Sequence, residues 1–250
     1  MSNLNDILKS FHLQDELNPK IWEENNGVYI MNPKVRTHLL EIADDFIEFI
    51  GVDILVSDVV MTGSLANYNW SKFSDVDIHI MVDFNQFSDD EKPLYEDLFF
   101  LKKSLYNTKH DFRIFGYDVE LYVEDESVIK SVKNIGVYSL LEDEWITEPE
   151  SESVEINYDI VKIKSKEWMK VIDSLIDNVD DEDLDTSKKL IKKYTDKIRN
   201  FRQTGLDKGG EYSNENLVFK VLRRNGYLEK LRGLSDKITD KKLSLKELNI

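Results

Sequence analysis

Two aspartates one position apart are the residues of this sequence whose types and spacing are best suited to chemistry. Asp75 and Asp77 alternate with apolar residues in the stretch DVDI, residues 75–78. A strand directs alternate side chains to opposite faces, so both carboxylates are expected on one face, where their charges repel. A divalent cation is the simplest group that compensates such a pair, because Mg²⁺ and Mn²⁺ prefer carboxylate oxygens.

Two further features accompany this pair along the chain. Gly63 and Ser64 end a segment rich in Val and Ile, about ten residues before Asp75. Glu120 lies in a later segment, 117–123, in which apolar and acidic residues alternate as in a half-buried strand. Three predicted strands must therefore bring these residues together.

This order of motifs resembles that of the polymerase-beta-like nucleotidyltransferases. Their pattern is Gly-Ser, a spacer of about ten residues, Asp-x-Asp and a third carboxylate on a later strand, and the resemblance covers residues 35–123. Family members commonly carry aspartate at the third position. Here Asp118 shares the expected face with Glu120 and stays an alternative, but the apolar frame VELYV matches the family better around Glu120.

The resemblance implies transfer of a nucleoside monophosphate from an NTP such as ATP to an acceptor hydroxyl, with release of pyrophosphate. Asp75 and Asp77 would bridge two Mg²⁺ or Mn²⁺ ions, and Glu120 would complete the site of the ion that activates the acceptor hydroxyl. Gly63 and Ser64 would present backbone N–H groups and a hydroxyl to the triphosphate.

Other residues near the motifs have more than one interpretation. Lys72, Lys189 and Lys193 are the candidates for a basic residue that neutralises the phosphates, and the sequence does not choose among them. His79 shares the expected face of the aspartates and could orient a metal-bound water or simply be a strand residue. The spacer holds three aromatic residues that could stack on a base or anchor the loop: Tyr68, Trp70 and Phe73.

The charge distribution bears on the acceptor. The net charge is -16, and residues 1–150 hold 12 Lys and Arg against 30 Asp and Glu, whereas residues 186–234 hold 13 against 5. This basic segment favours an RNA or tRNA end as acceptor, because Lys and Arg neutralise phosphates. Two alternatives stay open: nucleotidylation of a small molecule or protein, as in antibiotic adenylyltransferases or toxins, and a nucleotide-binding module without catalysis.

The composition also favours a cytoplasmic protein. The chain has no cysteine, which excludes disulfides and thiolate metal sites and suits a reducing compartment. The N-terminal residues lack a basic head followed by an apolar stretch, and no apolar run has the length of a membrane span, so we expect no membrane partner.

We expect an α+β fold, in which residues 1–150 form a mixed sheet with flanking helices and an N-terminal arm, and residues 151–250 form a helical bundle with a basic face. The polar segment 147–153 is the predicted linker. Apolar periodicity and capping residues predict helices over 32–51, 92–107, 160–179, 185–201 and 214–231. Strands are predicted over 53–64, 75–84, 112–125 and 136–142.

Overall fold

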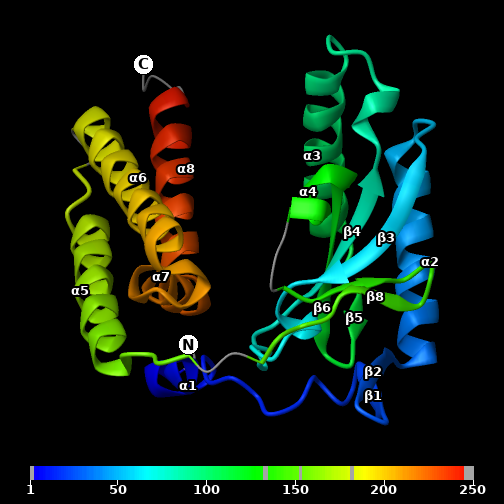
Figure 1. The fold of residues 1–250 in the computed structure, drawn as a ribbon. Coiled ribbons are helices and arrows are strands. Elements are labelled where there is room, and N and C mark those ends of the chain that lie inside the picture. Colours follow the sequence, from blue (N-terminus) through cyan, green and yellow to red (C-terminus); the bar gives the residue numbers. More distant parts are fainter. Residues whose placement is uncertain (1–2, 132–134, 152–153, 181–182, 245–250) are drawn as a thin grey trace. The chain divides into compact units, whose positions relative to one another are not determined.

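The chain forms two compact units in the computed structural model, which describes residues 3–131, 135–151, 154–180 and 183–244. The α/β unit is His12–Ser153, and the helical unit comprises Met1–Phe11 and Val154–Ile250 (Figure 1). The change of unit falls close to the predicted linker. The first eleven residues belong to the helical unit, whereas the rest of the N-terminal stretch, residues 12–31, belongs to the α/β unit.

The described residues of the α/β unit form a six-stranded mixed sheet, in the order β5-β6-β4-β3-β7-β8, and a separate hairpin of β1 and β2. The strands are β1 (Trp22–Asn25), β2 (Val28–Met31), β3 (Val56–Thr62), β4 (Val76–Val82), β5 (Arg113–Ile114), β6 (Tyr117–Asp125), β7 (Val137–Ser139) and β8 (Glu144–Thr147). The helices are α2 (Pro33–Ile50), α3 (Lys92–Lys109) and α4 (Glu126–Ser131), with short 3₁₀ turns η1 (Ser64–Ala66) and η2 (Phe84–Gln86). The predicted α+β class is confirmed.

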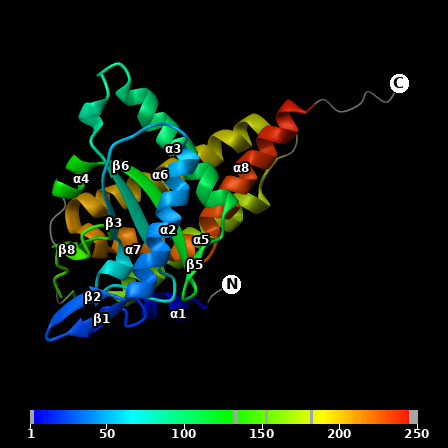
Figure 2. The same cartoon turned by 90° about the vertical axis from the view of Figure 1, so that its right-hand side faces the viewer.

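Three neighbouring strands at the centre of the sheet bring the sequence motifs together. β4 pairs antiparallel with β3 and parallel with β6. The register places Asp77 opposite Thr62 on one side and opposite Glu120 on the other. Parallel neighbours need a crossover connection, and α3 provides it between β4 and β6. Figure 1 labels β3, β4 and β6 together, and Figure 2 shows β3 and β6 near α2 and α3.

The helix α2 begins and ends where the sequence predicts. The Asn32 side chain accepts hydrogen bonds from the backbone N–H groups of Lys34 and Val35, and Pro33 occupies the first turn. Gly51 ends the helix in the left-handed conformation, with φ of 73°. The buried face of α2 packs into the main core through Val35, Leu39, Ala43, Phe46 and Ile50.

The predicted helix α3 is confirmed, but two leucines that contribute to its apolar periodicity are exposed. Leu94 and Leu101 are 69% and 64% exposed, whereas Phe99 and Tyr106 are buried. Phe99 and Tyr106 lie on a neighbouring face of the helix and pack against aromatic side chains of η2 and α2. Both faces have helical spacing, and the aromatic face is buried because it removes more apolar surface from water.

The same helix protects the edge of β6. The Asn107 side chain donates to the carbonyl of Leu121 at 3.0 Å and accepts from the Leu121 N–H at 3.2 Å. An amide side chain thus supplies the hydrogen bonds that a neighbouring strand would make, at a point beyond the short strand β5. This contact holds α3 against the strand that carries Glu120.

The helical unit contains α1 (Leu4–Lys9), α5 (Tyr158–Asp177), α6 (Leu184–Gly209), η3 (Gly210–Tyr212), α7 (Asn214–Arg224) and α8 (Tyr227–Leu243). The helix α6 continues past the predicted end at residue 201 and includes Gly205. A Cβ at Gly205 would lie 2.5 Å from the Cβ of Glu215, so glycine lets the start of α7 pack closely against α6. None of the helices in the described part of the chain is long and apolar enough to cross a membrane.

Candidate metal centre

Three carboxylates gather where β4 begins beside β6. Asp75, Asp77 and Glu120 offer oxygens that lie within 4.8 Å of one another, and each side chain is half-buried. Divalent cations bind oxygens at about 2.0–2.6 Å, so one ion can contact two oxygens that lie up to about twice that distance apart. Of the residues that the structure describes, these three form the acidic group with this geometry.

The local sequence explains why the like charges stay together. Val76 and Ile78 are fully buried on the opposite face from Asp77, so a shift of one residue would exchange apolar and acidic side chains. The parallel pairing with β6 then places Glu120 directly beside Asp77. The hydrophobic core therefore fixes two carboxylates as neighbours, and their repulsion makes the group receptive to a cation.

The turn after β3 lies against this group. Gly63 has φ of 76°, and a Cβ there would lie 2.0 Å from Asp77 Oδ2. Only glycine fits both the backbone angle and this contact. The Gly63 carbonyl accepts a hydrogen bond from the Asn67 side chain at 2.6 Å, and the hydroxyls of Ser64 and Ser74 are hydrogen-bonded at 2.7 Å. The predicted Gly-Ser turn is thus tied to the loop that leads into Asp75.

A tyrosine holds the third carboxylate. The Tyr122 hydroxyl donates to Glu120 Oε2 at 2.5 Å. Burial and this hydrogen bond raise the pKa of Tyr122 above its ordinary value, so the phenol stays protonated and remains a donor. The His79 ring stacks on the Tyr122 ring, with centroids 4.6 Å apart, and His79 Nδ1 lies 3.1 Å from Glu124 Oε2. His79 thus contacts Tyr122 and Glu124 and is not part of the acidic group.

A lysine that the sequence did not indicate lies over the Tyr122 ring. Lys103 Nζ, from α3, is 3.5 Å from the centroid of the Tyr122 ring. Burial lowers the pKa of Lys103, while the charges of Glu120, Glu124 and Asp77 act in the opposite direction. No local signal in the sequence distinguishes Lys103 from the other lysines of α3.

The remaining predicted residues lie outside the acidic group. Asp118 is exposed and pairs with Arg113 at 2.8 Å, so the structure brings Glu120 rather than Asp118 to Asp77. Lys72 is exposed in the spacer loop, 5.1 Å from the Phe73 ring. Lys189 and Lys193 belong to α6 of the helical unit, and their nucleotide-binding role stays a prediction.

Two of the spacer aromatics anchor the loop. Trp70 Nε1 donates to the Glu16 carbonyl at 2.9 Å, and the Trp70 carbonyl accepts from the Gln14 side chain. The Tyr68 carbonyl accepts from the Gln14 N–H at 2.7 Å, and both aromatic side chains pack against the main core. These contacts favour the anchoring interpretation of Tyr68 and Trp70.

Comparison of the chain with protein-family models, with curated proteins and with solved structures finds no match.

Replacing Gly63 by alanine should abolish binding of Mn²⁺, measured by calorimetric titration, because the new methyl group displaces the Asp77 carboxylate. The matched control is Gly27→Ala, since Gly27 also has a positive φ but a Cβ there would meet no atom within 4 Å. Gly27→Ala should cost about 1–2 kcal/mol of stability through backbone strain, and Gly63→Ala should cost more because its methyl group also meets Asp77. Unchanged Mn²⁺ affinity in Gly63→Ala would exclude this turn from the site.

Replacing Tyr122 by phenylalanine should weaken Mn²⁺ binding about 10- to 100-fold, the usual effect of removing a hydrogen bond that orients a metal ligand. The ring and its packing are kept, so thermal stability without metal should change little. Tyr95→Phe is the control, because the Tyr95 ring stacks on Phe87 away from the acidic group. Equal Mn²⁺ affinity in the two variants would show that Tyr122 does not orient Glu120.

Proposed function

We propose that this protein is a metal-dependent nucleotidyltransferase that moves a nucleoside monophosphate from an NTP to an acceptor hydroxyl. The observation that supports this most directly is the group of Asp75, Asp77 and Glu120, with oxygens within 4.8 Å, packed against the turn at Gly63. Carboxylates are the ligands that Mg²⁺ and Mn²⁺ prefer, and the glycine lets the turn pack directly against the Asp77 carboxylate.

The proposed reaction forms one bond and breaks one bond at the α-phosphorus. The acceptor oxygen bonds to phosphorus, the bond from phosphorus to the bridging oxygen breaks, and its electron pair leaves with pyrophosphate. Bound Mg²⁺ would lower the charge on the phosphates and the pKa of the acceptor hydroxyl. Asp75 and Asp77 would hold the Mg²⁺ ions, and Glu120 would accept the proton of the acceptor hydroxyl.

Two neighbouring residues have supporting roles in this proposal. Tyr122 occupies one oxygen of Glu120 and so leaves the other oxygen available for metal or proton. Lys103 places a cation next to the carboxylates, where it offsets part of the negative charge of the site. Ser64 and Lys72 are the further candidates for contacts with the triphosphate.

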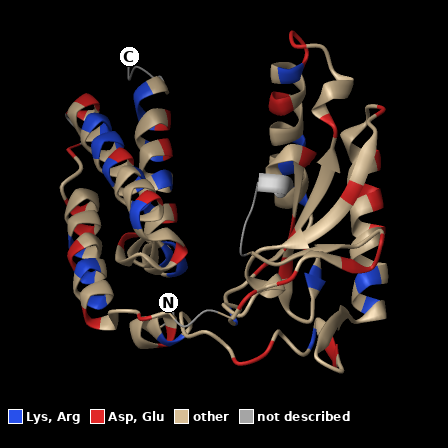
Figure 3. Cartoon of the chain, in the orientation of Figure 1, with Lys and Arg blue, Asp and Glu red and all other residues tan. Residues whose placement is uncertain are grey.

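An RNA or tRNA end is the acceptor that the charge distribution favours. Residues 186–234 carry 13 basic and 5 acidic residues, in a chain with net charge -16. In Figure 3, Lys and Arg recur along α6, whereas Asp and Glu predominate in the α/β unit. Such a basic segment suits phosphate contacts with a short strand, and the lack of cysteine suits a cytoplasmic enzyme.

The proposal predicts that the purified chain, incubated with Mg²⁺ or Mn²⁺, total cellular RNA and each α-³²P-labelled NTP in turn, labels an RNA band. Asp75→Asn/Asp77→Asn should lose this activity by at least about a thousandfold, because the metal ligands are removed. Asp118→Asn is the matched control and should keep it, since Asp118 is exposed and pairs with Arg113.

The outcomes of that assay separate the candidate functions. Label on protein or on a small product, lost in the double variant, would keep the catalytic site and reject RNA as acceptor. Label that persists in the double variant would contradict the proposed site. Failure to transfer label from any NTP would favour a nucleotide-binding module without catalysis.

A further inference from the structure

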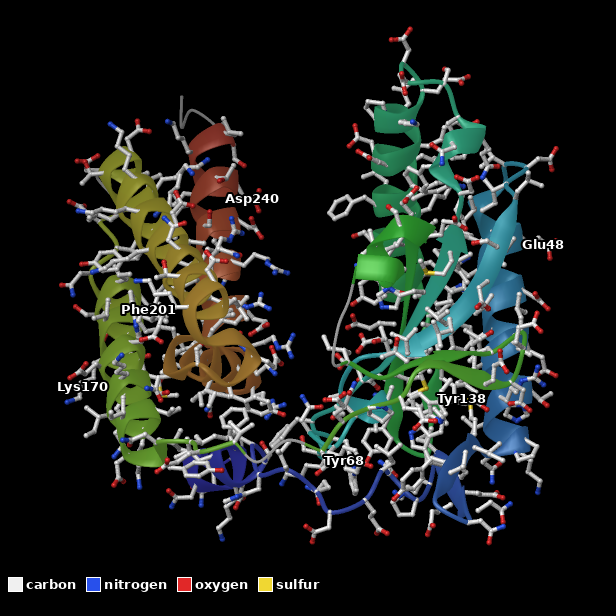
Figure 4. All side chains as sticks on the ribbon, in the orientation of Figure 1. Glu48, Tyr68, Tyr138, Lys170, Phe201 and Asp240 are labelled. Atoms are coloured by element: carbon white, nitrogen blue, oxygen red, sulfur yellow. The ribbon has the colours of Figure 1, made fainter. Side chains whose placement is uncertain are left out.

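A cavity of about 640 Å³ opens in the helical unit between α5, α6 and the start of α7. Its lining combines two aromatic rings, two lysines and several amide and hydroxyl groups. The side chains that matter for its chemistry are Trp168, Lys197, Asn200, Phe201, Thr204 and Lys208. Phe201 is labelled on α6 in Figure 4. The cavity lies wholly within one unit, so all of these positions belong to one packed set of helices.

The aromatic rings offer stacking surface. Trp168 of α5 and Phe201 of α6 have centroids 5.9 Å apart and planes inclined by 58°. Both side chains are half-buried, so part of each ring faces the cavity and not the interior of the bundle. Ring faces of this kind bind nucleobases of any sequence, because every base has a flat π surface.

The charge available in the cavity is positive. Lys197 Nζ lies 5.6 Å from the Trp168 ring, and Lys208 lies on the same side of α6 three turns later. Among the described residues neither lysine forms an ion pair. Glu215, the carboxylate of the lining, bonds to Lys164 at 2.9 Å; this bond and the charges of Lys164 and Lys208 lower the pKa of Glu215. The Glu215 charge is therefore offset within the protein.

The helix packing shapes the cavity at Gly205. A Cβ at this position would lie 2.5 Å from the Glu215 Cβ and 2.7 Å from Ser213 Oγ, so α7 starts directly against the backbone of α6. The lining at this end is backbone and small polar groups. Asn200 and Thr204, on the same side of α6, can donate and accept hydrogen bonds.

We propose that this cavity binds an unpaired nucleotide of a single-stranded nucleic acid, with the base against Trp168 and Phe201 and the phosphates near Lys197 and Lys208. A cavity of this volume falls in the range of small-ligand sites and suits one nucleotide, not a duplex. An acidic peptide would use the lysines but would leave the ring faces without a role. The identification of the bound strand as the RNA acceptor rests on the proposed function. The binding of a single strand does not depend on that function.

The test is fluorescence anisotropy of labelled twelve-nucleotide strands with the full chain, without NTP or metal, using oligo(U), oligo(dT) and a DNA duplex. Trp168→Ala should weaken binding of the single strands about tenfold, the usual loss for one stacked base. Trp168→Phe should restore most of it. Lys197→Ala/Lys208→Ala should weaken binding more strongly and reduce its dependence on salt.

The matched control is Lys188→Ala/Lys192→Ala, which removes two charges from the same helix but from residues that line a different cavity. It should weaken binding less than about threefold. Equal losses in the two double variants would overturn the proposal, because binding would then depend on diffuse charge. Absence of single-strand binding, equal duplex binding, or full affinity in Trp168→Ala would also overturn it.

The same assay separates this inference from the proposed function. Asp75→Asn/Asp77→Asn should bind the single strands as the unaltered chain does. Strand binding without any nucleotidyl transfer would support the cavity and remove the proposed enzyme. Transfer without strand binding at these residues would keep the enzyme and reject the cavity.

Discussion

The parallel pairing of β4 with β6 holds Asp77 beside Glu120, although the two carboxylates repel each other. The fully buried Ile78 and Leu121, on the other face, keep the register from slipping. The crossover helix α3 makes the pairing possible, protects the edge of β6 through Asn107, and brings Lys103 near the carboxylates. One strand register therefore determines both the core and the acidic group.

Local signals in the sequence suffice for much of this arrangement. The Asn32 cap and Gly51 bound α2 because capping chemistry depends on neighbouring residues alone. The alternation around Asp77 and Glu120 predicts their shared face for the same reason, since a strand has a period of two. The motif order then suggests that the two strands are neighbours, and the pairing of β4 with β6 agrees with that expectation.

Features that depend on contacts distant along the chain could not be predicted in this way. Lys103 reaches the Tyr122 ring only because α3 packs beside β6, and nothing in the local spacing distinguishes Lys103 from other lysines. The buried face of α3 is aromatic, although its leucines have equally regular spacing. The first eleven residues pack with helices that come more than 140 residues later, and no local pattern indicates this long-range packing. The contact between the Trp168 and Phe201 rings likewise joins two different helices, α5 and α6.

We expect Asp75, Asp77 and Glu120 to bind a divalent metal ion together. The most direct test is anomalous diffraction from crystals of the protein grown or soaked with Mn²⁺. An anomalous peak should lie among the three carboxylates, within about 2.0–2.6 Å of their oxygens. Ordered Mn²⁺ at other sites with none at this group, in crystals where the three side chains are accessible to solvent, would contradict it.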